Sequence, residues 1–210
     1  MPRPINTPVT PLNGDTMATI APTTSRWVWE GIDFRNLFWV FLALGIMVAA
    51  IVWGNDWALR YVHVASGILL TGADILFGFV VGPVLRSMPF EARRAYSLRM
   101  LPRTLFIMQT LGIMAPTSGW YLAVRMGYLD LGYPEFWWVI AALVIATILA
   151  VQGLGLLLPA NLRAYLELRK ENPDPEKIRR AMRTYFVTLA SQGIFQVLII
   201  MIMVKFATGI

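Results

Sequence analysis

Long apolar runs are the feature of this sequence that most constrains its fold. Five segments dominated by Leu, Ile, Val, Ala, Phe and Met occur at 34–53, 61–85, 104–124, 136–160 and 184–206. About 20 such residues are needed for a helix to cross the hydrocarbon core of a bilayer. Each run is expected to be helical, because unpaired backbone groups are not tolerated in lipid. The sequence therefore predicts an all-α, polytopic membrane helix bundle with five transmembrane helices.

The composition agrees with this class. The chain is 57% hydrophobic and only 14% charged, whereas soluble domains carry about 25% charged residues. It contains no cysteine, which excludes disulfides and thiolate ligation of iron–sulfur clusters. We expect a cytoplasmic tail rich in Pro and Thr, ending in an interfacial segment, over residues 1–33, and one transmembrane domain over residues 34–210.

Lysine and arginine are concentrated on one side of the predicted spans. The connections after the second and fourth spans are rich in arginine, whereas the opposite side has only Arg60, Arg125 and Lys205. The positive-inside rule then predicts a cytoplasmic N-terminus and an outside C-terminus. We interpret the net charge of +6 as a topology signal and as attraction to anionic lipid headgroups, and not as nucleic-acid binding. The basic residues predicted to form a cytoplasmic docking surface are Arg93, Arg94, Arg99, Arg103, Arg179, Arg180 and Arg183.

The second span holds His63 and Asp74, which are the one histidine and the one acidic residue within the apolar runs. They are 11 residues apart, which places them within roughly 20° of each other around an α-helix. Gly67, Gly78 and Gly82 continue the same stripe, and the last two form a Gly-x-x-x-Gly pair that lets another backbone come close. We expect this face to be buried against protein.

Two interpretations of these residues remain open. In the first, Asp74 is protonated or bonded to a neighbouring Gln or Ser, and His63 is a satisfied interfacial residue. In the second, His63 ligates a metal or haem iron. Other polar residues that could face the stripe, expected mainly to link helices by hydrogen bonds, are Gln109, Gln152, Gln192 and Gln196.

Several motifs between 58 and 207 resemble one family of bacterial membrane proteins. They are His63 early in a Gly-rich span, Gly82-Pro-Val-Leu-Arg86, Arg99-Met-Leu-Pro102, Ser118-Gly-Trp-Tyr-Leu122 and the closing Met203-Val-Lys205-Phe206. Together they resemble the CopD/HemJ-like superfamily, which includes copper-resistance CopD-type domains and related domains of unknown function. The resemblance implies a four-helix core, here with an extra N-terminal helix, in a bacterial cytoplasmic (inner) membrane.

The same resemblance implies a cofactor and its ligand. The histidine at the place of His63 is associated with haem b in that superfamily, so His63 would be an axial ligand, and Arg60 could pair with a haem propionate. This chain departs from the pattern because it has no second histidine and no lysine within its third span.

Three functions follow as expectations. The first is an accessory or scaffold subunit of a larger membrane complex, without catalytic activity of its own. It would dock through its tail, its basic cytoplasmic loops and its Gly-rich second helix. The second is a haem b electron-transfer or oxidoreductase subunit using His63. The third, and weakest, is a copper or small-solute transporter, since the 11 methionines offer soft thioether ligands.

Overall fold

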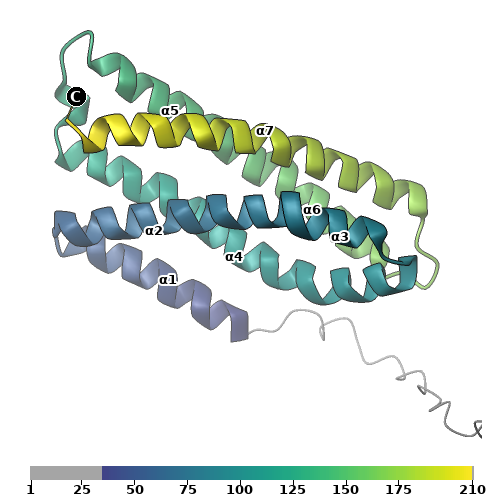
Figure 1. Ribbon diagram of the computed structural model, residues 1–210. Helices are drawn as coiled ribbons and strands as arrows, with labels where there is room; N and C mark the ends of the chain where they lie inside the picture. The colour runs from purple at the N-terminus through teal and green to yellow at the C-terminus, as the bar shows by residue number, and fades with distance from the viewer. Residues whose placement is uncertain (1–34, 210) are drawn as a thin grey trace, which may run out of the picture. The chain divides into compact units, whose positions relative to one another are not determined.

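The computed structural model describes residues 35–209, and this part of the chain consists of helices joined by short connections, with no strand (Figure 1). The predicted tail, residues 1–33, lies outside the described residues. The elements in chain order are α1 (Arg35–Val52), α2 (Asp56–Ile75), η1 (Leu76–Val81), α3 (Gly82–Ser87), α4 (Phe90–Arg125), η2 (Tyr128–Asp130), α5 (Phe136–Ala150), η3 (Val151–Leu157), α6 (Leu158–Leu168) and α7 (Pro175–Ala207). The all-α prediction is confirmed for these residues.

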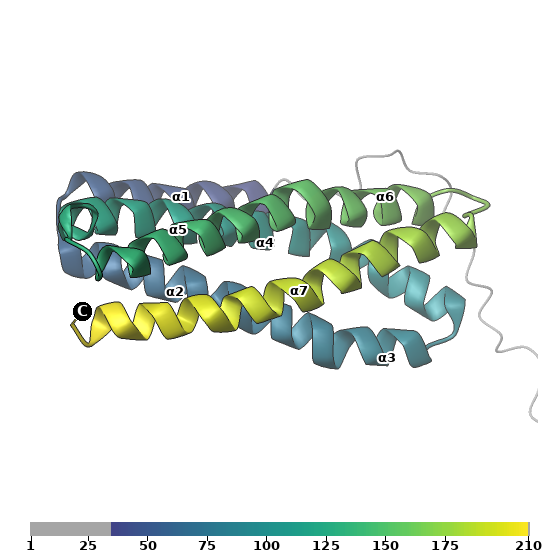
Figure 2. The same ribbon diagram turned by 90° about the horizontal axis from the view of Figure 1, so that it is seen from above.

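These elements assemble into long antiparallel rods. α2, η1 and α3 form one continuous helix, Asp56–Ser87, and α5, η3 and α6 form another, Phe136–Leu168. The α1–α2 turn, the α4–α5 connection and the C-terminus lie together at one end of the bundle (Figure 1, Figure 2). The α3–α4 and α6–α7 connections lie at the other end, which we call the arginine end because the basic residues gather there.

Two rods contain a π-helical segment that ends two residues before a proline. At the end of η1 the Gly82 N–H donates to the Phe77 carbonyl, five residues back instead of four, and η3 ends in the same way. Pro83 and Pro159 follow. A proline ring clashes with the carbonyl four residues earlier in a regular α-helix. The wider π turn makes room for the ring, so the rod continues where the α-helical pattern would break.

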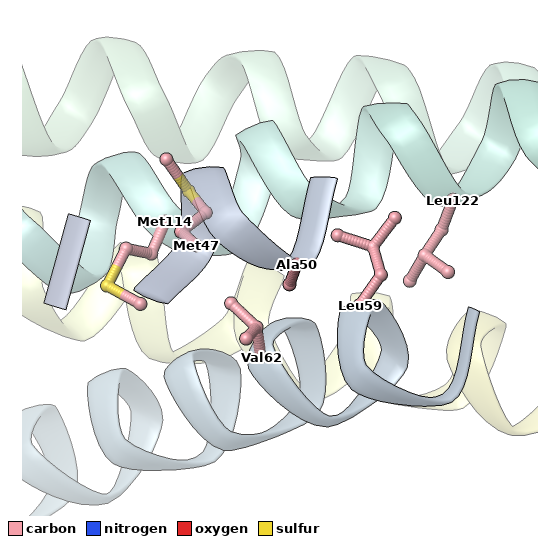
Figure 3. Close-up of a cluster of buried hydrophobic side chains, with 6 residues drawn as sticks. All are labelled: Met47, Ala50, Leu59, Val62, Met114 and Leu122. Carbon is pink, nitrogen blue, oxygen red and sulfur yellow. The ribbon is translucent and has the colours of Figure 1, made fainter. Parts of the chain in front are cut away.

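A cluster of buried apolar side chains lies where α1, α2 and α4 meet. Met47 and Ala50 of α1, Leu59 and Val62 of α2, and Met114 and Leu122 of α4 are all buried there (Figure 3). α1 packs against both α4 and α2, whereas α7 packs against α5, α6 and η3. α1 is therefore joined to the rest of the bundle by close packing.

Much of the outer surface is apolar. Phe79 is 80% exposed, and Ile194 and Val197 on α7 are also more than half exposed. Within the described residues, three rods are long and apolar enough to cross a membrane: Asp56–Ser87, Phe136–Leu168 and Pro175–Ala207. Leu37–Val52 is a shorter apolar helix. An outer surface of this kind is expected for a membrane protein, whose lipid-facing side chains need no polar coat.

The helices extend further than the predicted spans toward the arginine end. The third predicted span, 104–124, lies inside the 36-residue α4, and the fifth, 184–206, lies inside the 33-residue α7. Hydropathy marks only the part of a helix that suits lipid, and capping decides where it begins. Asp174 caps α7 as its position before Pro175 indicates, accepting hydrogen bonds from the Glu176 and Lys177 N–H groups at 2.9 and 3.3 Å.

The start of α4 differs from the sequence pattern. Ser87 precedes Pro89 and Glu91 in the arrangement of a helix cap. In the structure Ser87 Oγ instead donates to the Val84 carbonyl at the end of α3, and α4 begins after Pro89 with no side-chain cap. Ser87 therefore does not cap α4, because its hydroxyl satisfies the end of the preceding helix.

Candidate functional site

His63 lies in the seam between α2 and α4. Its Nδ1 is 2.9 Å from the Ala115 carbonyl oxygen and 3.4 Å from Ser118 Oγ. A carbonyl can only accept, so Nδ1 carries the hydrogen and donates it. In the neutral ring this leaves Nε2 as the atom with a free lone pair. The imidazole is thus an interhelical donor whose second nitrogen retains ligand chemistry.

Gly119 makes this position available to the ring. A Cβ placed on Gly119 would lie 2.7 Å from His63 Cε1, closer than real Cβ atoms come to other atoms, and 3.1 Å from Nδ1, which is also tight. Ser118, on the neighbouring position, is fully buried and donates to the Met114 carbonyl at 2.5 Å. The pair Ser118-Gly119 therefore shapes the surface of α4 that receives the imidazole.

Asp74 belongs to a different seam, between α2 and α7. Its side chain is buried, and Gln196 Nε2 donates to Asp74 Oδ2 at 2.7 Å. Gly78 and Gly82 face the same helix, where a Cβ would lie 3.5 Å from Leu189 and 2.9 Å from Phe186 respectively. The stripe that contains His63 and Asp74 is therefore divided between α4 and α7, and the two residues do not share one site.

The interpretation in which both ionisable groups are satisfied describes these contacts well. Gln196 bonds Asp74, and the Ala115 carbonyl bonds His63. The Gly-x-x-x-Gly pair packs against α7 of the same chain. Its use as a docking face for another protein is therefore withdrawn. Gly67, by contrast, has no neighbouring atom within 4 Å of an added Cβ.

Side-chain amides extend the Asp74 seam toward η3 and α6. Gln152 Nε2 donates to Ser191 Oγ at 3.1 Å, and Gln192, on α7, is buried. Asn161 hydrogen-bonds Tyr185. Within the described residues, the amide oxygens that are buried without a hydrogen-bond partner are those of Gln152, Asn161, Gln192 and Gln196. The interior between these rods is therefore rich in acceptors.

Asn161 and Tyr185 were missed by sequence reasoning. Asn161 follows Pro159 by two residues, beyond the predicted end of the fourth span at 160, and Tyr185 lies at the predicted edge of the fifth. Both positions are typical of interfacial residues. Only the continuation of α6 and α7 as long rods places them opposite each other.

Arginines predicted to dock partners have several different environments. Arg94 is half-buried and joins α4 to the end of α6, donating to the Leu168 and Lys170 carbonyls at 2.9 and 2.6 Å. Arg93 lies over the Phe90 ring. Arg179 and Arg180 pair with Glu176 on the exposed side of α7. Arg94 is therefore a structural clamp and not a free docking residue.

Three other arginines are exposed at the arginine end. Among the residues the structure describes, no carboxylate lies within salt-bridge distance of Arg99, Arg103 or Arg183. Arg60, the predicted propionate partner, is at the opposite end of α2 and donates to Met126 Sδ at 3.0 Å. Among the predicted docking arginines, those without a carboxylate partner in the described residues therefore lie on α4 and α7.

Residues that commonly bind metals are scattered in the described part of the chain. Within residues 35–209, no three His, Cys, Asp or Glu side chains come together as a ligand cluster. Gln109, the last predicted polar residue, lines a groove between α1 and α4.

No family model, no curated protein and no solved structure matches this chain. The resemblance to the CopD/HemJ-like superfamily therefore stays a prediction, and the function is argued from the geometry.

Proposed function

We propose that this chain is an accessory subunit of a larger membrane complex, in which it serves as a membrane-embedded scaffold. It crosses a bacterial inner membrane five times with its N-terminus in the cytoplasm. The proposal is supported by the arginine end, where α7 begins nine residues before the predicted span at 184, about 14 Å along the helix axis.

The docking surface is the exposed basic stripe of α7, which consists of Arg179, Arg180 and Arg183. Spacings of three and four residues place these side chains on one side of the helix. The first two pair with Glu176, but exposed pairs of this kind contribute only about 0–1 kcal/mol and yield readily to a partner. A partner with an acidic surface at the membrane face fits this stripe.

Complex size in native membranes tests the proposal. The full chain extracted in mild detergent is expected to migrate in native electrophoresis as part of a stable assembly. R179Q/R180Q/R183Q should shift it to the mass of the free chain in detergent. R99Q/R103Q, which removes charge from α4 instead, is the matched control and should leave the assembly intact. A wild-type chain that migrates alone would refute the scaffold function.

A haem-binding electron-transfer subunit is the second candidate, and the geometry of His63 favours it. Histidines that ligate metals usually donate the second ring N–H to a carbonyl or carboxylate, as Nδ1 does here toward Ala115. These residues have the chemistry that haem binding needs. His63 Nε2 would be the iron ligand, and Arg60, near the outer end of α2, would pair with a propionate. Bound haem would supply one-electron transfer.

Visible spectroscopy separates the two candidates. A haem subunit predicts a Soret band in the purified chain that is lost in His63→Ala and kept in Ser66→Ala, whose hydroxyl bonds only the Val62 and His63 carbonyls of its own helix. A colourless wild-type protein, purified from its native membrane without loss of partners, would rule the haem candidate out.

A further inference from the structure

An apolar groove runs between the first half of α1 and the middle of α4. It has a volume of about 320 Å³, at the lower end of the range of about 300–1,000 Å³ for small-molecule sites. α1 contributes Leu37, Val40 and Leu44, and α4 contributes Phe106 and Ile113 among others. Most of these side chains are only half-buried, so the groove can be reached from outside the bundle.

Two polar residues of α4 also line the groove. Thr110 is buried and already donates its hydroxyl to the Phe106 carbonyl at 2.7 Å. Gln109 is half-buried, and its side chain makes no hydrogen bond with the residues the structure describes. The groove is therefore apolar along its length with a single available amide.

Positive charge lies at the end of this groove. Arg99 precedes Phe106 by seven residues, and Arg103 precedes Thr110 by seven, so each arginine lies within roughly 20° of a groove residue around α4. Arg103 is about 9 Å from Gln109 along the helix axis. Both guanidinium groups are exposed and lack a carboxylate partner within the described part of the chain.

We propose that this face binds one anionic phospholipid lengthwise. The phosphate lies at Arg99 and Arg103, the Gln109 amide can bond an ester oxygen below it, and one acyl chain fills the groove between α1 and α4. Guanidinium groups bind phosphate bidentately, and basic pockets between membrane helices are suited to anionic headgroups. Charge and apolar surface follow one another along α4 in the same order as in a phospholipid. This site is separate from the α7 basic stripe.

Native mass spectrometry of the full chain in detergent tests the site. The protein is stripped of lipid and titrated with dioleoyl phosphatidylglycerol, dioleoyl phosphatidylcholine or glycerol 3-phosphate. Phosphatidylglycerol is expected to be retained more strongly than phosphatidylcholine. R99Q/R103Q should weaken that binding about tenfold or more, since each arginine near an anionic surface strengthens binding about fivefold. R179Q/R180Q/R183Q, on α7, should leave it unchanged.

The acyl chain is tested by filling the groove. Val40→Trp should abolish retention of phosphatidylglycerol, whereas Val48→Trp, the same change at an exposed position of α1 outside the groove, should not. Glycerol 3-phosphate competing as well as the lipid, with no effect of Val40→Trp, would show a phosphate site and overturn the lipid proposal. If R179Q/R180Q/R183Q weakened phosphatidylglycerol binding as much as R99Q/R103Q does, the attraction would be unspecific and the lipid proposal would also be overturned. Neither outcome bears on complex size, which tests the scaffold function.

Discussion

At the scale of single residues, the imidazole of His63 occupies the space that a side chain on Gly119 would take. A methyl group there would lie 2.7 Å from the ring, while the ring is held by its bond to the Ala115 carbonyl. Ala at Gly119 should destabilise the protein by about 1–3 kcal/mol, the usual cost of overpacking. Thermal unfolding in detergent measures the effect.

Gly112 on the same helix is the control. An added Cβ there has no neighbour within 4 Å, so Gly112→Ala should be neutral or stabilising through helix propensity. Adding His63→Ala to Gly119→Ala should recover part of the loss, because the two changes share one contact. If the two glycine variants behaved alike, the close packing of His63 on Gly119 would be disproved.

The Asp74–Gln196 bond allows a second test at this scale. Asp74→Ala leaves the buried Gln196 amide nitrogen without its acceptor, which should cost about 1–3 kcal/mol. Asp74→Asn keeps an oxygen that can accept the same hydrogen and should cost less. Unfolding of the two variants side by side gives the comparison. An Asn variant no more stable than the Ala variant would mean that a neutral acceptor oxygen cannot replace the carboxylate in this seam.

At the scale of the helices, Asp174 links the start of α7 to pH. Hydrogen bonds from the Glu176 and Lys177 N–H groups hold the pKa of the Asp174 carboxyl below its ordinary value of 3.8. A lowered folded-state pKa adds stability above the unfolded pKa, and that stability is lost as pH falls through the folded value.

Asp174→Asn isolates this contribution, since Asn also caps helices but does not titrate. The unfolding temperature of the wild type should exceed that of the Asn variant by a constant amount at neutral pH, and the difference should shrink below about pH 4. Scans between neutral pH and about pH 2.5 measure it. A difference independent of pH would mean that the carboxylate charge does not stabilise the cap.

At the scale of the whole molecule, the proposed topology places the two ends of the bundle on opposite sides of the membrane. The chain has no cysteine, so single cysteines can be introduced without background. Gly132→Cys, on the exposed α4–α5 connection, should react with a membrane-impermeant maleimide in intact cells. Asn172→Cys, on the exposed α6–α7 connection, should react only after the membrane is opened.

The reverse labelling pattern would invert the predicted orientation and place the arginine end outside. Equal labelling of both positions in intact cells would place both connections on the same side of the membrane. In the latter case α5 to α6 would not cross the membrane, although Phe136–Leu168 is long and apolar enough to do so.

The sequence alone determined the helical class and which residues deserved attention. Runs of apolar residues permit only helices in lipid, and His63 and Asp74 stood out because isolated ionisable groups are costly there. A hydrogen bond from a Gln or Ser to Asp74 was one of the interpretations left open, because several such residues lie in the neighbouring apolar runs. Such inferences depend on local composition and period, which a sequence contains in full.

The tertiary structure decided which helix each residue meets. One stripe on α2 contacts α4 at His63 and α7 at Asp74, and the Gly78–Gly82 pair packs within the chain instead of against a partner. The bonds of Arg94 to the end of α6 and the groove beside Gln109 also depend on which rods are neighbours. Helical period fixes the side of a helix on which a residue lies, whereas the packing of long rods around one another fixes what it touches.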